Sequence, residues 1–301
     1  MATQFDRSAE DLGNSVHLEH LNLTIPDQQP AILFYIVGLG FTRDPYLLVG
    51  LQNMWVNIGR SQIHMPAASQ AQAVRGHVGL VVPDLKGLVK RLEAVREKLA
   101  GTRFEFSKRD GYVEARCPWG NEFRCYAPDE KRFGRIALGL PYIAFDVVKG
   151  AAEPISRFYS KIIGVPVEKK KNGTAGASTR VTVGMKQHLV FNETSATLPP
   201  YDGHHIQIYV ANFSGPHRQL GERDLISEES DQYQYRFRKI VDPETGELAH
   251  ELEHEVRSVT HPLYARPLVN RNPEQSNRGY MPGYDAAAWS IGSQPSGVEL
   301  K

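Results

Sequence analysis

The chain has 301 residues, of which 41% are hydrophobic and 23% are charged, a balance typical of a soluble globular protein. Its 35 basic and 34 acidic residues leave a net charge of +1, which argues against nucleic acid or an acidic membrane surface as a partner. No apolar run approaches the ~20 residues that span a bilayer, and the polar N-terminus is unlike a signal or transit peptide. We therefore expect a cytoplasmic protein whose two cysteines, Cys117 and Cys125, are reduced thiols.

Four segments of the chain repeat one pattern: a short apolar strand, a helical stretch, and then two or three further strands. A repeat of this kind predicts a chain built from one supersecondary unit that is used several times. The four segments are 16–66, 76–128, 138–195 and 203–260.

The first segment opens with HLEHLNLTIPD, whose alternating apolar residues predict a half-buried strand at Leu18–Ile25. Pro26 and Asp27 stop this strand and open a helix, because proline is tolerated in a first helical turn and aspartate favours a helix start. We expect this helix to end at Gly38 and Gly40, before the remaining strands of the segment.

The second segment also has a first strand that ends in Pro-Asp, and it contains the clearest helix. The apolar residues of this helix recur at steps of three and four, which predicts one buried face. They are Leu88, Leu92, Val95 and Leu99. Further along, Pro118-Trp119-Gly120 predicts a hairpin between the last two strands of the segment.

The third and fourth segments open with the strand patterns LPYIAFDVV and HHIQIYVANF. The helix of the third segment ends in FYSKIIGV (Phe158–Val165), and that of the first ends in FYIVGLGF (Phe34–Phe41). Both fit the pattern FYxxxhG, in which h is apolar. We expect the aromatic pair to pack the helix onto a sheet and the glycine to end the helix in a left-handed conformation.

This FYxxxhG pattern, together with the Pro-Asp helix opening, resembles the vicinal oxygen chelate superfamily, which includes glyoxalases, fosfomycin and bleomycin resistance proteins and extradiol dioxygenases. In that superfamily two βαβββ units form one module, whose curved sheet encloses a metal cup. The resemblance implies an α+β fold of two tandem glyoxalase-type modules, in which four βαβββ repeats form curved mixed sheets around open cups. The modules would span 16–130 and 138–260, and 261–301 would be an extended tail.

The resemblance further implies ligand positions near the start of the first strand of each repeat and on the fourth strand. In the N-terminal module these positions carry His20, His77 and His64. The last ligand position falls on Arg124, while Glu122 points to the same sheet face two residues earlier. Two interpretations stay open here. Either Glu122 supplies the carboxylate, or it pairs with Arg124 in a metal-free cup that favours an anionic substrate.

In the C-terminal module, Tyr142 and His205 occupy the two first-strand positions. We expect Tyr142 to hydrogen-bond a substrate oxygen, since a phenolate is an uncommon ligand here, and His205 to bind metal or substrate. The final strand, ELAHELEHEVRS, offers several glutamates on one face, and Glu253 is the predicted ligand. An inserted residue in the preceding turn, Thr245, leaves this register open by one position.

These residues favour a metal-dependent enzyme that acts on a small substrate with vicinal oxygens, by ring-cleaving dioxygenation, isomerisation or lyase chemistry. Two imidazoles and a carboxylate suit Fe(II), Mn(II), Zn or Ni and leave open positions for a substrate. The alternative is a metal-free protein of the same fold that sequesters a small molecule, which Arg124 and Tyr142 at ligand positions favour. In either case Arg124 and Tyr142 are candidate catalytic and substrate-binding residues, and a homodimer is compatible with the sequence.

Overall fold

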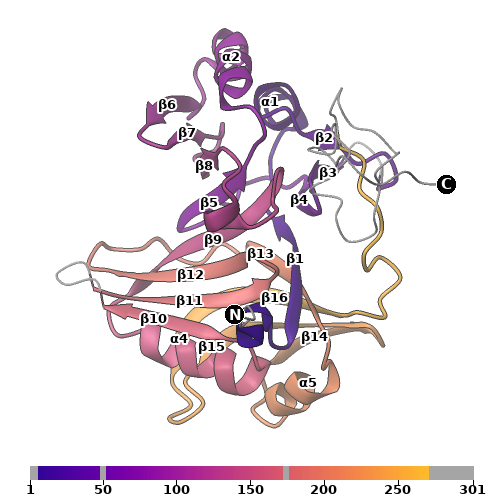
Figure 1. The fold of residues 1–301 in the computed structure, drawn as a ribbon, viewed down its shortest axis with the longest axis vertical. Coiled ribbons are helices and arrows are strands. Elements are labelled where there is room, and N and C mark those ends of the chain that lie inside the picture. The colour runs from indigo at the N-terminus through magenta and orange to yellow at the C-terminus, as the bar shows by residue number, and fades with distance from the viewer. Residues whose placement is uncertain (1–5, 48–51, 172–175, 271–301) are drawn as a thin grey trace, which may run out of the picture.

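The computed structural model describes residues 6–47, 52–171 and 176–270, and its named strands form two eight-stranded mixed sheets (Figure 1). In spatial order the first sheet contains β14 (Ile226–Asp231), β15 (Gln234–Val241), β16 (Leu248–Ser258), β13 (His205–Val210), β1 (Ser15–Asn22), β4 (Ser61–Pro66), β3 (Asn53–Ile58) and β2 (Thr42–Arg43). The second sheet contains β10 (Val167–Lys171), β11 (Ala177–Gly184), β12 (Gln187–Thr194), β9 (Gly139–Val148), β5 (Gly76–Val81), β8 (Glu122–Tyr126), β7 (Tyr112–Arg116) and β6 (Glu105–Arg109). This arrangement confirms the predicted fold of two glyoxalase-type modules.

Each sheet combines one repeat from the N-terminal half of the sequence with one repeat from the C-terminal half. Strand β1 of the first repeat pairs antiparallel with β13 of the fourth, and β5 of the second pairs antiparallel with β9 of the third. The expectation that 16–130 and 138–260 would each enclose their own cup is therefore wrong. The physical reason is that a strand edge pairs through its backbone N–H and C=O groups, so the side-chain pattern of one repeat does not specify which other repeat will cover its open edge.

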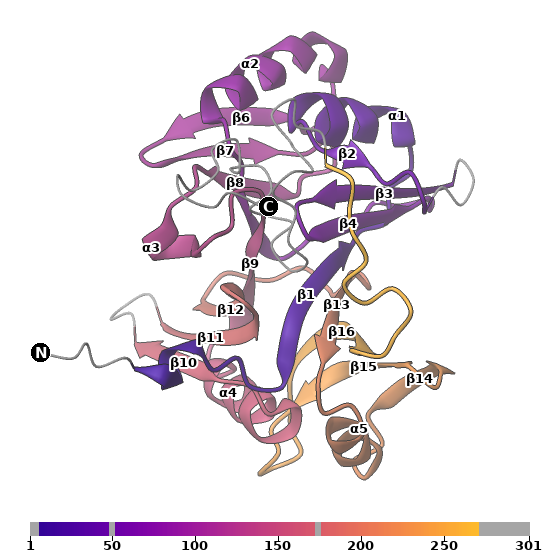
Figure 2. The same ribbon diagram turned by 45° about the vertical axis from the view of Figure 1, so that its right-hand side comes forward.

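Helices α1 and α2 lie together at one end of the molecule, α4 and α5 lie at the other end, and α3 lies between them (Figure 2). They are α1 (Gln28–Ala31), α2 (Leu85–Val95), α3 (Glu130–Phe133), α4 (Ala152–Phe158) and α5 (Ser214–Gly221). The expected helix openings are present, because Asp27 and Asp84 cap α1 and α2 by accepting hydrogen bonds from the backbone N–H groups of Gln29 and Gly87.

The two FYxxxhG motifs occupy equivalent places in the first and third repeats. Helix α1 continues into a π-helical turn at Ile32–Gly38, and α4 continues into one at Tyr159–Ile163. The motif tyrosines, Tyr35 and Tyr159, are fully buried. The motif glycines, Gly40 and Gly164, have φ of +81° and +82°, so both take the left-handed conformation that the sequence predicts.

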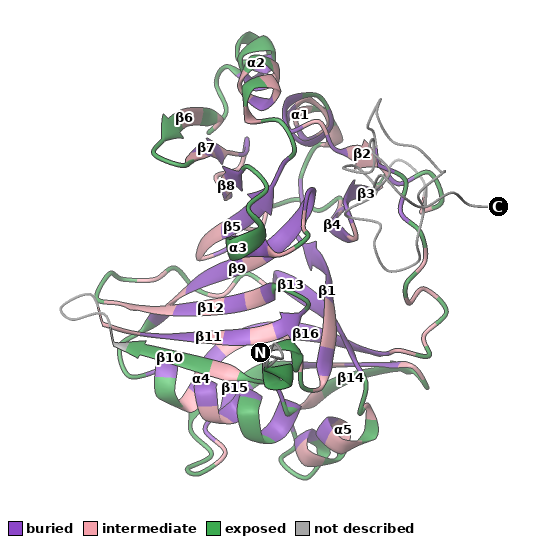
Figure 3. Cartoon of the chain, viewed as in Figure 1, coloured by how far each residue is buried: buried purple, intermediate pink, exposed green. Residues whose placement is uncertain are grey.

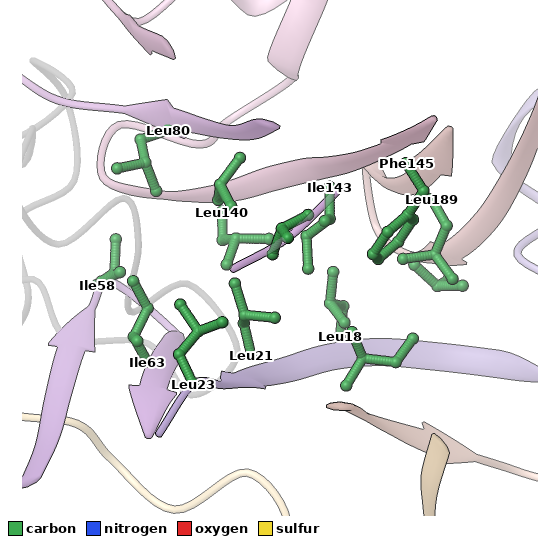
Figure 4. Close-up of a cluster of buried hydrophobic side chains, with 14 of the residues drawn as sticks. Leu18, Leu21, Leu23, Ile58, Ile63, Leu80, Leu140, Ile143, Phe145 and Leu189 are labelled. Atoms are coloured by element: carbon green, nitrogen blue, oxygen red, sulfur yellow. The ribbon is translucent and has the colours of Figure 1, made fainter. Parts of the chain in front are cut away.

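A common hydrophobic core lies between the two sheets. Leu18 and Leu21 of β1 face Leu140 and Ile143 of β9, and all four are at most 1% exposed (Figure 4). The middle strands of both sheets are mostly buried, whereas β10 and α3 are largely exposed (Figure 3). Burial of one such leucine side chain contributes about 1.5–3 kcal/mol to folding, so this seam holds the two sheets together.

The chain leaves β16 and runs across the edge of the first sheet toward the turn between β3 and β4. Arg266 Nη2 lies 2.8 Å from the buried Asp44 Oδ2. Asn270 makes two hydrogen bonds to the backbone of Gly59, each 2.9 Å long. The expected tail at 261–301 therefore begins as an irregular segment that packs on the sheet, and its part beyond 270 lies outside the described residues.

Two further expectations concern the cysteines and the membrane. Cys117 and Cys125 are buried and free of disulfide bonds, as predicted. None of the helices within the described ranges has the length and apolar character needed to cross a membrane.

Candidate metal site

The junction of β1 and β13 brings together one histidine from the first repeat and one from the fourth. The ring centroids of His20 and His205 lie 5.8 Å apart, and the two residues are only 1% and 7% exposed. The sequence predicted that His20 would share a cup with His77, which is wrong, because His77 lies on β5 in the other sheet. Likewise His205 and Tyr142 were expected together but belong to different sheets.

A β-bulge in β1 determines where the His20 side chain points. Leu18 pairs with Ile208 and His20 pairs with Gln207, so β1 contains one more residue than β13 between these pairs. The extra residue is Glu19. The bulge lets Leu18 stay in the core while Glu19 and His20 both turn to the opposite face. There His20 Nδ1 lies 2.9 Å from Glu19 Oε2 and donates to it, which leaves the His20 Nε2 lone pair available.

The carboxylate of this site comes from Glu255 on β16. His20, His205 and Glu255 each offer one ligand atom, and these atoms lie within 4.8 Å of one another. Within the described ranges this is the one group of three or more histidine, cysteine or acidic residues that could hold a metal ion.

The sequence predicted Glu253 as the carboxylate, whereas the group of converging ligand atoms contains Glu255, two residues further along the same face of the strand. Glu253 is the direct partner of His205 in the parallel pair, but its carboxylate lies 2.8 Å from Arg236 Nη1 and outside the ligand group. The first repeat shows the same two-residue offset. His20 pairs with Gln62 in the ladder, while His64 lies two residues further along the strand. Side chains on a strand lean along the direction of the strand. The side chain nearest to a histidine on the neighbouring strand is therefore not that of its ladder partner.

His64 lies at the edge of the ligand group. Its ring centroid is 5.9 Å from that of His20, and its ring stacks on Trp55 at 3.7 Å. His64 Nε2 lies 2.5 Å from Asn53 Oδ1, so this nitrogen is turned away from the group. His64 has the same position relative to His20 as Glu255 has relative to His205, but it is not a member of the ligand group.

Burial keeps the imidazoles of the site neutral. Desolvation lowers the pKa of His20 to about 3 and the pKa values of His64 and His205 to about 2. Neighbouring cationic arginines, Arg236 among them, add to the effect. Neutral imidazoles at physiological pH are the form that binds metal ions.

A ladder of charged residues surrounds Glu255. Its two carboxylate oxygens lie 2.5 Å from Arg236 Nη2 and 2.6 Å from Arg257 Nη2. Arg257 also approaches Glu19 Oε2 at 3.4 Å. Arg236 also contacts Glu253 and Glu228, so each guanidinium group of the ladder contacts more than one carboxyl group.

Several buried polar atoms at the site have no hydrogen-bond partner in the described structure. An unsatisfied buried polar group costs about 1–3 kcal/mol, so a cluster of them marks a place where a ligand completes the structure. The atoms are His20 Nε2, His205 Nε2, Asn22 Oδ1, Gln207 Nε2 and Gln207 Oε1.

The corresponding place in the second sheet has a different set of side chains. His77 occupies the position of His20, but Val190 on β12 stands where the first sheet has Glu255. Glu122 accepts hydrogen bonds from Arg124, with Nη2 at 2.9 Å and Nε at 3.0 Å. Glu122 is thus engaged by Arg124, as the second of the two sequence-based interpretations expects.

Aromatic hydroxyl groups complete this second cup. The hydroxyl groups of Tyr142 and Tyr126 lie 2.9 Å apart. Burial and the Tyr126 hydrogen bond raise the pKa of Tyr142, so it stays a neutral phenol. Burial and the charge of Arg124 lower the pKa of His77 to about 4.

Comparison with known proteins supports the fold. No family model and no curated protein sequence matches the chain. A putative dioxygenase from Bacillus subtilis subsp. subtilis str. 168 has a similar structure, with a TM-score of 0.55 and 14% identity over 81% of this chain and 86% of that one. Glyoxalase I from Zea mays is similar with a TM-score of 0.53 and 14% identity over 80% of this chain and 92% of that one. The chain therefore has the fold of the vicinal oxygen chelate superfamily, as its sequence pattern predicted.

Proposed function

We propose that the protein is a metal-dependent enzyme of the vicinal oxygen chelate type and that its metal is held by His20, His205 and Glu255. The observation that carries the proposal is the convergence of one ligand atom each from His20, His205 and Glu255 within 4.8 Å of one another, where both histidines also have a buried Nε2 without a hydrogen-bond partner. Two imidazoles and one carboxylate form a donor set that suits Fe(II), Mn(II), Zn or Ni and leaves coordination positions open.

The residues around this group fit a bound divalent metal. Glu19 fixes the His20 tautomer through Nδ1, which is the support that metal-ligating histidines commonly receive from a carboxylate. Each Glu255 oxygen can accept a second interaction besides its arginine. The carboxyl groups that contact Arg236 and Arg257 offset the repulsion between these arginines and a metal cation.

A divalent metal at this site would act as a Lewis acid toward a substrate that has two adjacent oxygens. The protein itself would orient that substrate. The amides of Gln207 and Asn22 carry unpartnered buried atoms beside the ligand group, so they can exchange hydrogen bonds with substrate oxygens. The Trp55 ring forms an apolar wall against His20 and His64. Ring-cleaving dioxygenation, isomerisation and lyase chemistry all begin from a substrate bound in this way.

A second candidate function belongs to the cup of the second sheet. The pairing of Glu122 with Arg124 and the valine at position 190 favour a metal-free site there. Arg124, Tyr142 and His77 would bind an anionic small molecule through charge and hydrogen bonds. This is the sequestering role that the sequence offers as its alternative, and it can coexist with a metal at the first sheet.

Metal analysis of protein purified anaerobically and without chelator tests the first proposal. We expect about one transition metal per chain, and its loss in His20→Ala and in His205→Ala. His77→Ala is the matched control, because His77 has the same place in the other sheet and should leave the metal content unchanged. Absence of metal after reconstitution with Fe(II), Mn(II), Zn and Ni, or equal loss in His77→Ala, would overturn the proposal.

A further inference from the structure

A cavity of about 370 Å³ lies at the seam between the two sheets, beside the second cup, whose Tyr126 packs against the cavity residue Phe133. Connecting segments build most of its wall, namely the N-terminal segment at Leu12, the β3–β4 turn, the chain from 133 to 140, the β11–β12 turn and the tail at Tyr264. None of the proposed metal ligands and none of the residues of the second cup lines it. Its volume lies within the range of small-molecule sites, which is about 300–1,000 Å³.

The deep part of this seam cavity is apolar. Leu138 and Leu140 are 3% and 1% exposed, and Phe133 is 4% exposed. The polar side chains among them are already satisfied. Gln187 Nε2 donates to Leu18 O and Leu140 O at 2.9 and 3.1 Å.

The histidine in the wall adds no charge to the seam cavity. His17 Nε2 lies 3.0 Å from the carbonyl oxygen of Arg60, and burial lowers the pKa of His17 to about 4. The inner wall formed by Phe133, Leu138 and Leu140 is therefore apolar and has a neutral histidine beside it, which suits a hydrocarbon group.

The charged lining is of one sign. Among the residues that the structure describes, the charged side chains that line the cavity are those of Arg60, Arg135 and Lys186. Arg135 and Lys186 are exposed, as is Met185 beside them, so the positive charge lies at the rim. An apolar interior with a cationic rim complements a molecule that has an apolar body and one anionic end.

We infer that the seam cavity binds a small amphipathic monocarboxylate, with the carboxylate at Arg135 and Lys186 and the apolar body against Leu138 and Leu140. The cavity equals the liquid volume of roughly a dozen water molecules, which limits the ligand to about ten non-hydrogen atoms. Octanoate is a probe of this size and charge, and octylamine is its cationic counterpart.

Isothermal titration of the full-length protein with octanoate tests the inference. We expect one saturable site per chain and at least tenfold weaker binding of octylamine. The double variant Arg135→Glu, Lys186→Glu should bind octanoate at least tenfold more weakly. The double variant Lys90→Glu, Lys98→Glu is the matched control, because it changes the net charge equally at exposed residues on and just after α2 and should bind like the wild type.

Two single variants separate the seam cavity from the other sites. Octanoate binding should persist in His20→Ala and in Arg124→Ala, because neither residue lines the cavity. A thermal shift of the wild-type protein by octanoate but not by octylamine gives a readout that does not depend on any variant. The inference is overturned if octanoate does not bind, if octylamine binds as tightly, if the Arg135 and Lys186 double variant binds unchanged, or if Arg124→Ala or His20→Ala abolishes binding.

Discussion

Glu19 and His20 are consecutive residues of one strand, yet their side chains lie on the same face of the sheet, with Oε2 and Nδ1 2.9 Å apart. A regular strand would send them to opposite faces. The bulge in β1 therefore creates a carboxylate–imidazole pair from neighbours in the sequence, and it leaves the other ring nitrogen pointing toward His205 and Glu255.

The first prediction concerns this pair. Glu19→Gln removes the charge that orients His20 but keeps the size of the side chain, so metal affinity should fall about 10- to 100-fold. Competition with a chromogenic chelator measures the change. Asp202→Asn is a suitable control, because Asp202 makes a similar pair with His204 at 2.6 Å away from the ligand group. Equal affinity of Glu19→Gln and wild type would contradict the role assigned to Glu19.

The second prediction distinguishes the two neighbouring glutamates of β16. Glu255→Gln should lose most of the bound metal, because an amide is a much poorer ligand than a carboxylate. Glu253→Gln should retain it, since the Glu253 carboxylate lies outside the ligand group and pairs with Arg236. Elemental analysis of both purified variants gives the answer, and metal loss confined to Glu253→Gln would show that the ligand is the earlier residue.

The third prediction concerns acid stability and His250. Burial lowers the pKa of His250 from 6.5 to about 3 in the folded protein, whereas the unfolded chain keeps the ordinary value. The unfolded state therefore binds the extra proton first as the pH falls, and stability is lost between pH 6.5 and 3. His250→Phe should reduce the slope of unfolding free energy against pH by up to about 1.4 kcal/mol per pH unit in this window.

Urea unfolding at a series of pH values between about 8 and 4 measures this slope in both proteins. The wild type and His250→Phe should show parallel behaviour above pH 7, where His250 is neutral in both states. Parallel curves below pH 6 as well would mean that His250 is protonated in the folded protein.

The fourth prediction concerns the contact between the sheets. Leu18→Ala should lower the free energy of unfolding by about 2–5 kcal/mol, because Leu18 is fully buried against the second sheet (Figure 4). Val148→Ala at the end of β9 is the control and should cost less than about 0.5 kcal/mol, since Val148 is 57% exposed. Chemical denaturation of the two variants compares them directly, and similar losses would show that the seam does not behave as a packed core.

The sequence was sufficient to predict the repeats and three of the residues near the site. The periodic apolar residues, the Pro-Asp openings and the two FYxxxhG motifs are local signals, and each corresponds to the helix or turn that was expected. His20, His64 and His205 were identified from their places within the repeats. The helix and turn predictions are confirmed because they depend on contacts close in sequence, whereas the role of the three histidines stays a prediction.

The pairing of the repeats and the choice of Glu255 could not be predicted in the same way. Strand β1 pairs with β13, which lies almost two hundred residues later, through backbone groups that every residue has. The choice between Glu253 and Glu255 depends on how side chains lean across two paired strands, and no single strand contains that information. A two-residue step moves a ligand about 6.6 Å, so a small error in register changes the proposed site.

The pairing of the first repeat with the fourth and of the second with the third has a consequence for dividing the chain. A break near Gly134 would give two fragments that each contain half of both cups, so neither fragment could carry the His20, His205 and Glu255 group alone. Each fragment would also expose the unpaired edges of two first strands. The same edges that seal the intact molecule would then drive the fragments to reassociate, and activity would return only as a property of the reassembled pair.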